Sequence, residues 1–202
     1  MFYFLTFPFL LIGVLLWPKK ERTFWIIVEV KSMAYSTRLE DYIFSLYQSI
    51  HIYEPEHLNM ELIASRLGVD VEYINGASKT IHMSENPLIL INRHLTPEAQ
   101  WQDFGQELGH LLRHCGNQMC LPLPFIELQE WQANNFALHF CIPTFMMEQL
   151  DFPWRKQEVI YLLARTFTVE FSFAARRLER WLQQRESLYF WQAVTEAQEH
   201  YL

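Results

Sequence analysis

The stretch Trp101-Gln-Asp-Phe-Gly-Gln-Glu-Leu-Gly-His-Leu-Leu-Arg-His114 predicts one amphipathic helix around which the fold is built. At its centre, Gln106 and His110 stand four residues apart, a spacing that places two side chains on one face of a helix. Two His at that spacing, with a Glu after the first, are the signature of zinc peptidases, where the Glu activates a metal-bound water. Glu107 occupies the position of that Glu, but the first ligand position holds Gln106. The helix therefore belongs to a metallopeptidase, to a damaged one, or to a protein with an unrelated function.

A second helix, expected from about residue 125 to residue 140, carries further polar side chains that suit such a site. Glu130 and Asn134 are four residues apart and share a face of that helix. The separation from His110 to Glu130 leaves room for a loop and an antiparallel return. In that layout Glu130 supplies a third zinc ligand, Asn134 orients the ligands, and a fourth position stays open for water. Glu107 would then act as the general base.

Taken together, these segments resemble the ImmA/IrrE-type metallo-endopeptidases of mobile elements, phages and stress-response operons. The resemblance rests on Phe104-Gly-Gln-Glu-Leu-Gly-His-Leu-Leu-Arg-His114, on Glu130-Trp-Gln-Ala-Asn-Asn-Phe-Ala137 and on the Cys141-Ile-Pro143 step that follows. The segment Leu88-Ile-Leu-Ile-Asn92 is similar to the strand that precedes the first helix in that family. The similarity extends over residues 33–185.

This resemblance implies a function and a role for each matching residue. Glu107 matches the catalytic Glu, His110 the second zinc ligand and Glu130 the third. Gln106 departs from the family, which has a His there, and a neutral amide oxygen is a weaker zinc donor than imidazole. The implied activity is zinc-dependent cleavage of a protein regulator, a helix-turn-helix repressor of a phage or mobile element, with Gln106 as the residue that would impair it. The alternative is an inactive pseudopeptidase that binds the same regulator; a third, weaker hypothesis is a DNA-binding module.

The composition indicates a globular protein that does not bind nucleic acid directly. Half of the 202 residues are hydrophobic and 16% are aromatic, enough for a packed core. The net charge is −7, whereas a general nucleic-acid binder usually has a basic surface. Three cysteines without a CxxC pair are a poor disulfide framework, which favours reduced thiols in the cytoplasm.

The N-terminal segment differs from the rest of the chain. Residues 1–17 carry no charge and are followed by Lys19, Lys20 and Arg22. The segment is short for a membrane span, which needs roughly 20 apolar residues, and it lacks the basic start and cleavage site of a signal peptide. Residues 1–32 are therefore interpreted as an extension upstream of a true start at Met33, and residues 33–202 as the peptidase-like domain. A membrane tether with a cytoplasmic domain is the alternative.

The remaining pattern predicts an α+β fold that is predominantly helical and zincin-like, with a small antiparallel sheet. Helices are expected at about residues 39–50 and 56–67, the second ended by Gly68. Alternation from Val69 and the dipeptide Asn75-Gly76 predict a hairpin, and about three strands are expected before Thr96 and Pro97 open the central helix. Further helices are predicted over residues 154–167, 170–184 and 186–201.

Several other residues compete for a role in the site. His114 lies four residues after His110 and is a substitute ligand in principle, but a polar residue at a helix C-terminus is the simpler interpretation. Glu127 is second choice to Glu130, and His139 is expected to be packed or exposed. Cys115 and Cys120 are expected to be inert thiols. The aromatic residues Trp101, Phe104, Trp131, Phe136 and Phe140 are expected in the core, with some lining a substrate groove.

Overall fold

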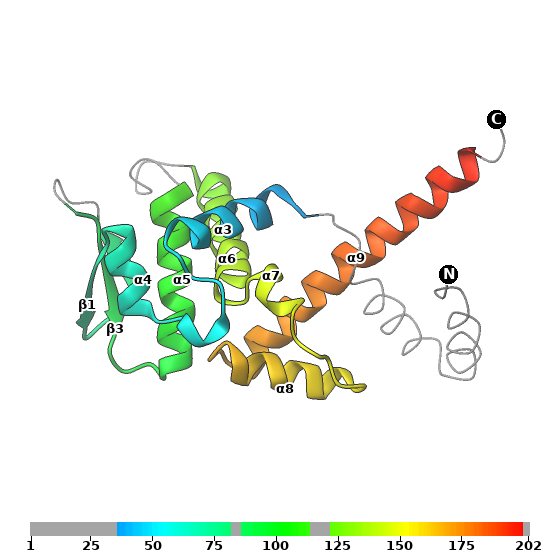
Figure 1. The fold of residues 1–202 in the computed structure, drawn as a ribbon. Helices are drawn as coiled ribbons and strands as arrows, with labels where there is room; N and C mark the ends of the chain where they lie inside the picture. The colour runs from blue at the N-terminus through cyan, green and yellow to red at the C-terminus, as the bar shows by residue number, and fades with distance from the viewer. Residues whose placement is uncertain (1–35, 82–85, 114–121, 200–202) are drawn as a thin grey trace. The chain divides into compact units, whose positions relative to one another are not determined.

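The computed structural model describes residues 36–81, 86–113 and 122–199, with side chains described as far as residue 187. These residues form mostly helices with one small sheet, which confirms the predicted α+β fold class (Figure 1). The elements, in chain order, are α3 (Arg38–Ser49), η1 (Pro55–His57), α4 (Met60–Leu67), β1 (Asp70–Ile74), β2 (Lys79–Ile81), β3 (Leu88–Asn92), α5 (Pro97–Arg113), α6 (Leu123–Cys141), α7 (Thr144–Met147), α8 (Lys156–Thr166) and α9 (Phe171–Glu199).

Residues 36–177 form one compact unit, and residues from 178 onward belong to a second. Every candidate site residue that the structure describes lies in the first unit. Residues 1–32, which the sequence interpretation set apart, lie outside the described residues. No helix within the described ranges is long and apolar enough to cross a membrane.

The sheet has three strands, as predicted, but one of its two pairings is parallel. Its strand order is β1-β3-β2: β1 pairs with β3 in parallel, and β2 pairs with β3 antiparallel. The expectation of a wholly antiparallel sheet, with β1 and β2 joined as a hairpin at Asn75-Gly76, was therefore wrong. Burial explains the order, because β3 is the apolar strand (Leu-Ile-Leu-Ile-Asn) and its central residues are buried, so it lies between two largely exposed strands.

Local capping signals fix several helix boundaries, although the helix predicted from residue 56 begins only at Met60, after the separate turn η1. Thr37 and Glu40 form a reciprocal capping box at the start of α3. Gly68 ends α4 in the left-handed conformation, at φ 69°. The backbone N–H of Ala99 donates to the Thr96 hydroxyl at 3.3 Å, which caps α5 just before Pro97. The two C-terminal helices expected on either side of residue 185 are one continuous helix, α9, because no Gly or Pro interrupts residues 171–199.

The core of the first unit is an aromatic cluster between α5 and α6. Trp101, Phe104, Phe136 and Phe140 are buried, and Phe140 stacks on Tyr47 of α3 with ring centroids 5.2 Å apart. The Tyr47 hydroxyl donates to the Phe140 carbonyl at 2.8 Å, which ties α3 to the end of α6. These four aromatic positions were predicted to be core. The fifth, Trp131, was also expected there but is 57% exposed.

Two glycines let α5 and α6 approach closely. A Cβ added at Gly105 would lie 2.8 Å from the Cys141 Sγ, and one added at Gly109 would lie 3.0 Å from the Phe136 ring. Because Gly105 and Gly109 are four residues apart, they share the face of α5 that meets α6. The close crossing brings the polar face of α5 within reach of α6.

A second polar cluster is buried where α3, α6, α7 and the start of α9 meet. The Thr144 hydroxyl donates to Glu40 Oε1 at 2.6 Å, and Arg177 donates from Nη2 to the Thr144 hydroxyl oxygen at 2.6 Å and from Nε to the Ile142 carbonyl at 3.1 Å. Arg177 Nη2 lies 3.9 Å from Glu40 Oε1, and their side chains are 0% and 8% exposed. His139 Nδ1 lies 3.8 Å from the same oxygen. These contacts hold α3 against α7 and the start of α9.

Candidate metal centre

Three side chains from two helices converge at the crossing of α5 and α6. Gln106 and His110 lie one turn apart on α5 and face Glu130 of α6. The Gln106 amide donates from Nε2 to Glu130 Oε2 at 3.3 Å, and His110 Nε2 lies 3.4 Å from Glu130 Oε1. The Glu130 side chain is 42% exposed and the His110 side chain 13% exposed, so the centre opens to solvent on its α6 side. The sequence analysis predicted that these three residues meet. Glu130, rather than the alternative Glu127, contacts Gln106 and His110.

The donor set fits a zinc ion in position but supplies one weak ligand. Catalytic zinc sites usually have three protein ligands and one open position. Here the three are an imidazole, a carboxylate and a primary amide. Gln106 presents a nitrogen to Glu130, and a half turn about its last bond would present the oxygen instead. Within the described residues there is no group of three or more His, Cys, Asp or Glu that could hold a metal.

Glu107 lies beside this centre and is held by the sheet. The Thr80 hydroxyl of β2 lies 2.9 Å from Glu107 Oε2 and 3.0 Å from the Glu107 carbonyl, both of which can accept its proton. Burial raises the pKa of the Glu107 carboxyl above its ordinary value; the Thr80 hydrogen bond opposes that rise, and the nearby charges of Asp103 and Glu130 add to it. A half-buried carboxylate with a raised pKa is a stronger base than an exposed one.

Thr80 contacts Glu107 directly and was not identified by sequence reasoning. Only an indirect signal was available. Thr80 is the central residue of a short strand whose neighbours Lys79 and Ile81 are exposed, so alternation turns its side chain to the opposite face, toward α5. Which residue of α5 it would meet depends on how the sheet packs against that helix.

Of the other residues considered in the sequence analysis, some lie near the centre, some are buried elsewhere, and some fall outside the described residues. Asn134 donates from Nδ2 to the main-chain carbonyl of Glu130 at 2.8 Å, so its amide contacts its own helix rather than the Glu130 carboxylate. His139 is buried beside Glu40, as expected for a packed residue. Cys141 is buried and its thiol is free. The predictions for His114, Cys115 and Cys120 fall outside the described residues.

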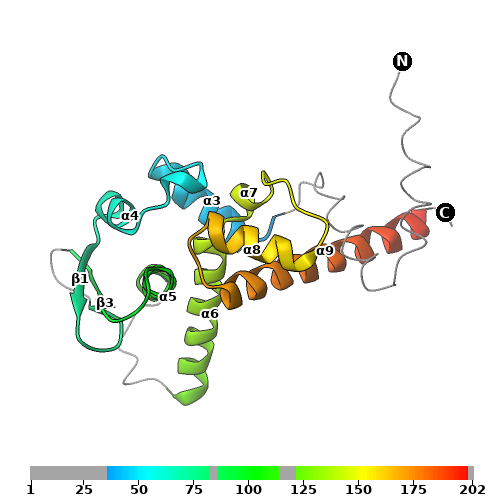
Figure 2. The same ribbon diagram turned by 90° about the horizontal axis from the view of Figure 1, so that it is seen from below.

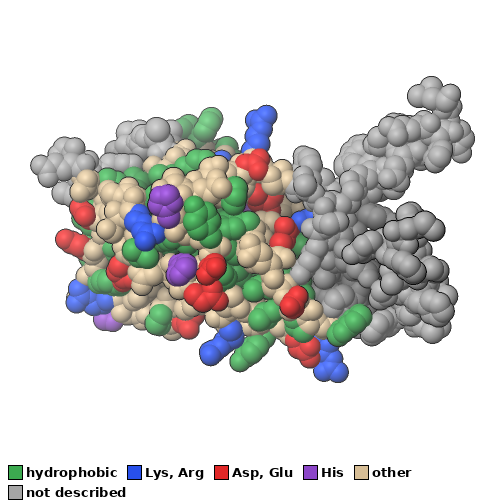
Figure 3. Space-filling model, viewed as in Figure 1, with side chains coloured by type: hydrophobic (Ala, Val, Ile, Leu, Met, Phe, Trp, Pro, Cys, Tyr) green, Lys and Arg blue, Asp and Glu red, His purple; other side chains and the backbone are tan. Residues whose placement is uncertain are grey.

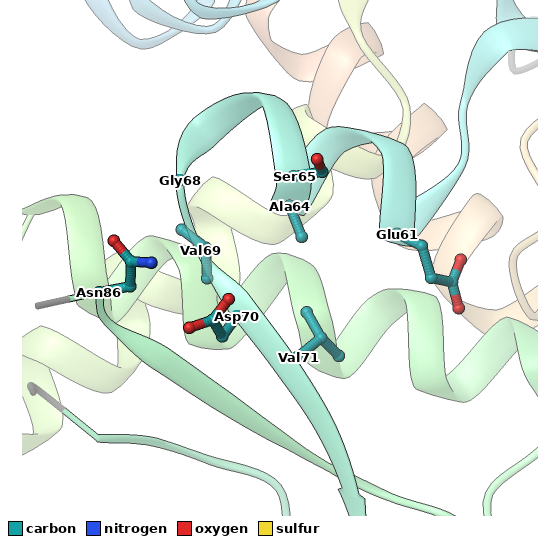
Figure 4. Close-up of a pocket in the computed structure, with 8 residues that line it drawn as sticks. All are labelled: Glu61, Ala64, Ser65, Gly68, Val69, Asp70, Val71 and Asn86. Atoms are coloured by element: carbon teal, nitrogen blue, oxygen red, sulfur yellow. The ribbon is translucent and has the colours of Figure 1, made fainter.

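A pocket beside α4 and the distribution of basic side chains on one face are the other surface features of note. A shallow pocket of about 330 Å³ lies between α4 and the start of β1, with Glu61, Asp70 and Asn86 in its wall (Figure 4). Its described lining residues are all distinct from those of the centre at α5 and α6, and they include carboxylates and no basic side chain. On the face drawn in Figure 3, Lys and Arg side chains are scattered among acidic and apolar ones.

A predominantly helical α+β domain with Glu107, His110 and Glu130 at the crossing of two central helices is consistent with a zincin-like fold. Comparison with known proteins gives the family. The family model described as the IrrE N-terminal-like domain, Peptidase_M78, matches residues 64–179, and the chain belongs to this family. The resemblance inferred from the α5 and α6 segments is thereby confirmed.

Two proteins of Bacillus subtilis (strain 168) are similar over most of the chain. The phage-like element PBSX protein XkdA is 36% identical over 156 residues, which cover 77% of this chain and 79% of XkdA. The uncharacterized protein YqaB is 34% identical over 160 residues, covering 79% of this chain and 93% of YqaB. A solved structure, a Mycobacterium tuberculosis transcriptional regulator, has a TM-score of 0.49 and 17% identity; the match covers 76% of this chain and half the length of that one.

Proposed function

We propose that this protein is an IrrE-type endopeptidase that acts on a protein regulator, a helix-turn-helix repressor of a phage-like element, in the cytoplasm. The observation that carries the proposal is the meeting of Gln106 and His110 with Glu130, with Glu107 alongside. Family membership supports the peptidase chemistry. The similarity to a protein of the PBSX phage-like element supports the kind of regulator.

In this proposal His110 Nε2 and Glu130 hold a zinc ion, and the Gln106 amide oxygen takes the remaining protein position. When bound, zinc would lower the pKa of a bound water and polarise the peptide carbonyl. Thr80 fixes Glu107 Oε2 through its hydroxyl, which leaves Oε1 as the oxygen that takes the proton of the attacking water and passes it to the leaving amine. The partly buried setting of Glu107 favours proton uptake by raising its pKa.

A second candidate is a pseudopeptidase that binds the same regulator without cutting it. One observation favours it: the Gln106 amide donates from nitrogen to Glu130 and so uses the carboxylate that would otherwise bind the metal. Replacing an imidazole with a neutral amide lowers zinc affinity, and a member of the family that has lost its metal keeps its fold and its binding surface.

The experiment that separates the two candidates is a cleavage assay with a purified helix-turn-helix repressor of a phage-like element. Native protein, Gln106→His and Glu107→Gln are each incubated with the repressor and zinc, and the products are identified by mass spectrometry. The endopeptidase proposal expects slow cleavage by the native protein, faster cleavage at the same bond by Gln106→His, and none by Glu107→Gln. Cleavage by Gln106→His alone would establish the pseudopeptidase, and no cleavage by any variant would reject the peptidase function.

A further inference from the structure

The two halves of α6 differ sharply in exposure. In the second half, Ala133, Phe136, Ala137 and Phe140 are buried against α5 and its neighbours. In the first half, four large apolar side chains are exposed, whereas Ile126 is partly buried: Leu123 is 66% exposed, Phe125 58%, Leu128 48% and Trp131 57%. In Figure 2, α5 is seen end-on and the first half of α6 extends past it.

Three of these side chains form one stripe along the helix. Phe125, Leu128 and Trp131 follow one another at intervals of three residues, so they are neighbours on one side of the helix. A contiguous exposed stripe with two aromatic residues is unfavourable in water and is typical of a binding surface, where aromatic anchors carry most of the affinity. We call Phe125, Leu128 and Trp131 the α6 stripe.

Charges beside the α6 stripe indicate the chemistry of what it binds. Glu127 is exposed, lies four residues before Trp131 and three before Glu130, and so stands between the stripe and the candidate metal centre. Over its whole length α6 has two carboxylates, Glu127 and Glu130, and no Lys or Arg. Glu130 already contacts Gln106 and His110, so the exposed Glu127 is the charge available at the edge of the stripe. An apolar surface edged by a carboxylate favours a segment that is apolar with a basic flank.

We propose that the α6 stripe is the docking surface for an apolar, positively charged segment of the regulator. This inference rests on the function proposed above and adds the place where the regulator binds. A segment seated on Phe125, Leu128 and Trp131 would have its basic flank at Glu127 and its backbone beside the Glu130 carboxylate. The stripe therefore positions the regulator relative to the centre at α5 and α6.

The test is a binding measurement that does not depend on cleavage. The full chain is titrated in EDTA against a fluorescently labelled helix-turn-helix repressor of a phage-like element, and the dissociation constant is obtained from anisotropy. Trp131→Ala and Leu128→Ala are each expected to weaken binding at least tenfold, as for buried anchors in an interface. Trp154→Ala is the matched control, because Trp154 is 59% exposed and lies outside α6; its dissociation constant should stay within about twofold.

The charge component is tested with Glu127→Gln, which should weaken binding about threefold at low salt and have no effect at 0.5 M salt, where exposed charges are screened. Thermal melts of all variants establish that they are folded. Binding by the native chain that Trp131→Ala and Leu128→Ala leave unchanged would overturn the docking surface and leave the proposed function standing. Failure of the native chain to bind the repressor would overturn both, and self-association abolished by Trp131→Ala would reassign the stripe to a second copy of this chain.

Discussion

At the scale of single residues, Gln106 and Glu107 determine what the centre can do. Gln106 keeps the position and length of a ligand side chain but offers a neutral oxygen or an N–H in place of a basic nitrogen. As it lies in the structure, it donates to Glu130 at 3.3 Å and links α5 to α6. The sequence predicted which residues meet here; it could not predict the direction of this amide, which depends on the position of the Glu130 carboxylate.

The raised pKa of Glu107 makes a prediction about stability and pH. Because folding raises this pKa, the native state holds the proton more tightly than the unfolded chain does, and the contribution of Glu107 to stability falls as the pH rises from the ordinary glutamate value through the raised one. Glu107→Gln has no charge to bury. In EDTA it should melt roughly 2 °C or more above the native protein at pH 7 to 8, with a gain that shrinks towards zero by about pH 4.

The measurement is a series of thermal melts between pH 4 and pH 8, with Glu127→Gln as the control because Glu127 is exposed on α6. The control should follow the native curve. A Glu107→Gln variant that is less stable than the native protein by the same amount at every pH would mean that the Thr80 hydrogen bond to Oε2 outweighs the cost of burial.

At the scale of elements, the buried cluster of Glu40, Thr144 and Arg177 holds α3 in place. Arg177→Met removes the guanidinium and leaves Glu40 buried without its charge partner, which should cost about 3–5 kcal/mol. Urea unfolding measures this loss. In a Glu40→Gln background the same substitution should cost much less, because no buried charge is then left uncompensated.

Arg155→Met is the matched control for that prediction. Arg155 and Glu158 form a pair 3.6 Å apart, with side chains 83% and 50% exposed, and an exposed pair contributes roughly 0–1 kcal/mol. If Arg177→Met and Arg155→Met cost the same, the cluster does not anchor α3.

The close crossing of α5 and α6 makes a separate prediction. Gly105→Ala gains roughly 1 kcal/mol of helix propensity but forces a methyl group to within 2.8 Å of the Cys141 Sγ, in a packed core where such overfilling costs about 1–3 kcal/mol. A net loss of about 1 kcal/mol is expected in urea unfolding. In a Cys141→Ala background, where the sulfur is gone, Gly105→Ala should be neutral or stabilising, and an equal loss in both backgrounds would contradict the packing argument.

The elements also show which structural features could be predicted from local sequence and which could not. Gly68 and Thr96 predicted helix ends correctly, because caps are decided by a few neighbouring residues. Asn75-Gly76 misled the strand pairing, because strand order depends on which strand is most buried, and β3 comes after the turn. Trp131 was placed in the core, because periodicity does not show where α6 extends past α5.

At the scale of the whole molecule, the family followed from two segments whose order and spacing agree. Neither the helix around Gln106 nor the one around Glu130 was decisive alone, and the match over residues 64–179 confirms the family they indicated together. The centre was predictable because residues four apart on a helix share a face. The contribution of Thr80 was not, since it depends on the packing of a sheet against α5.

The central claim is that α5 and α6 build a zinc site weakened by one residue. Isothermal titration with zinc, on the native protein, Gln106→His and Gln106→His/Glu130→Gln, tests it most directly. The account predicts that Gln106→His binds one zinc per chain at least about 100-fold more tightly than the native protein, and that Glu130→Gln removes that gain. A Gln106→His variant that binds zinc no more tightly than the native protein would contradict the assignment of His110 and Glu130 as metal ligands.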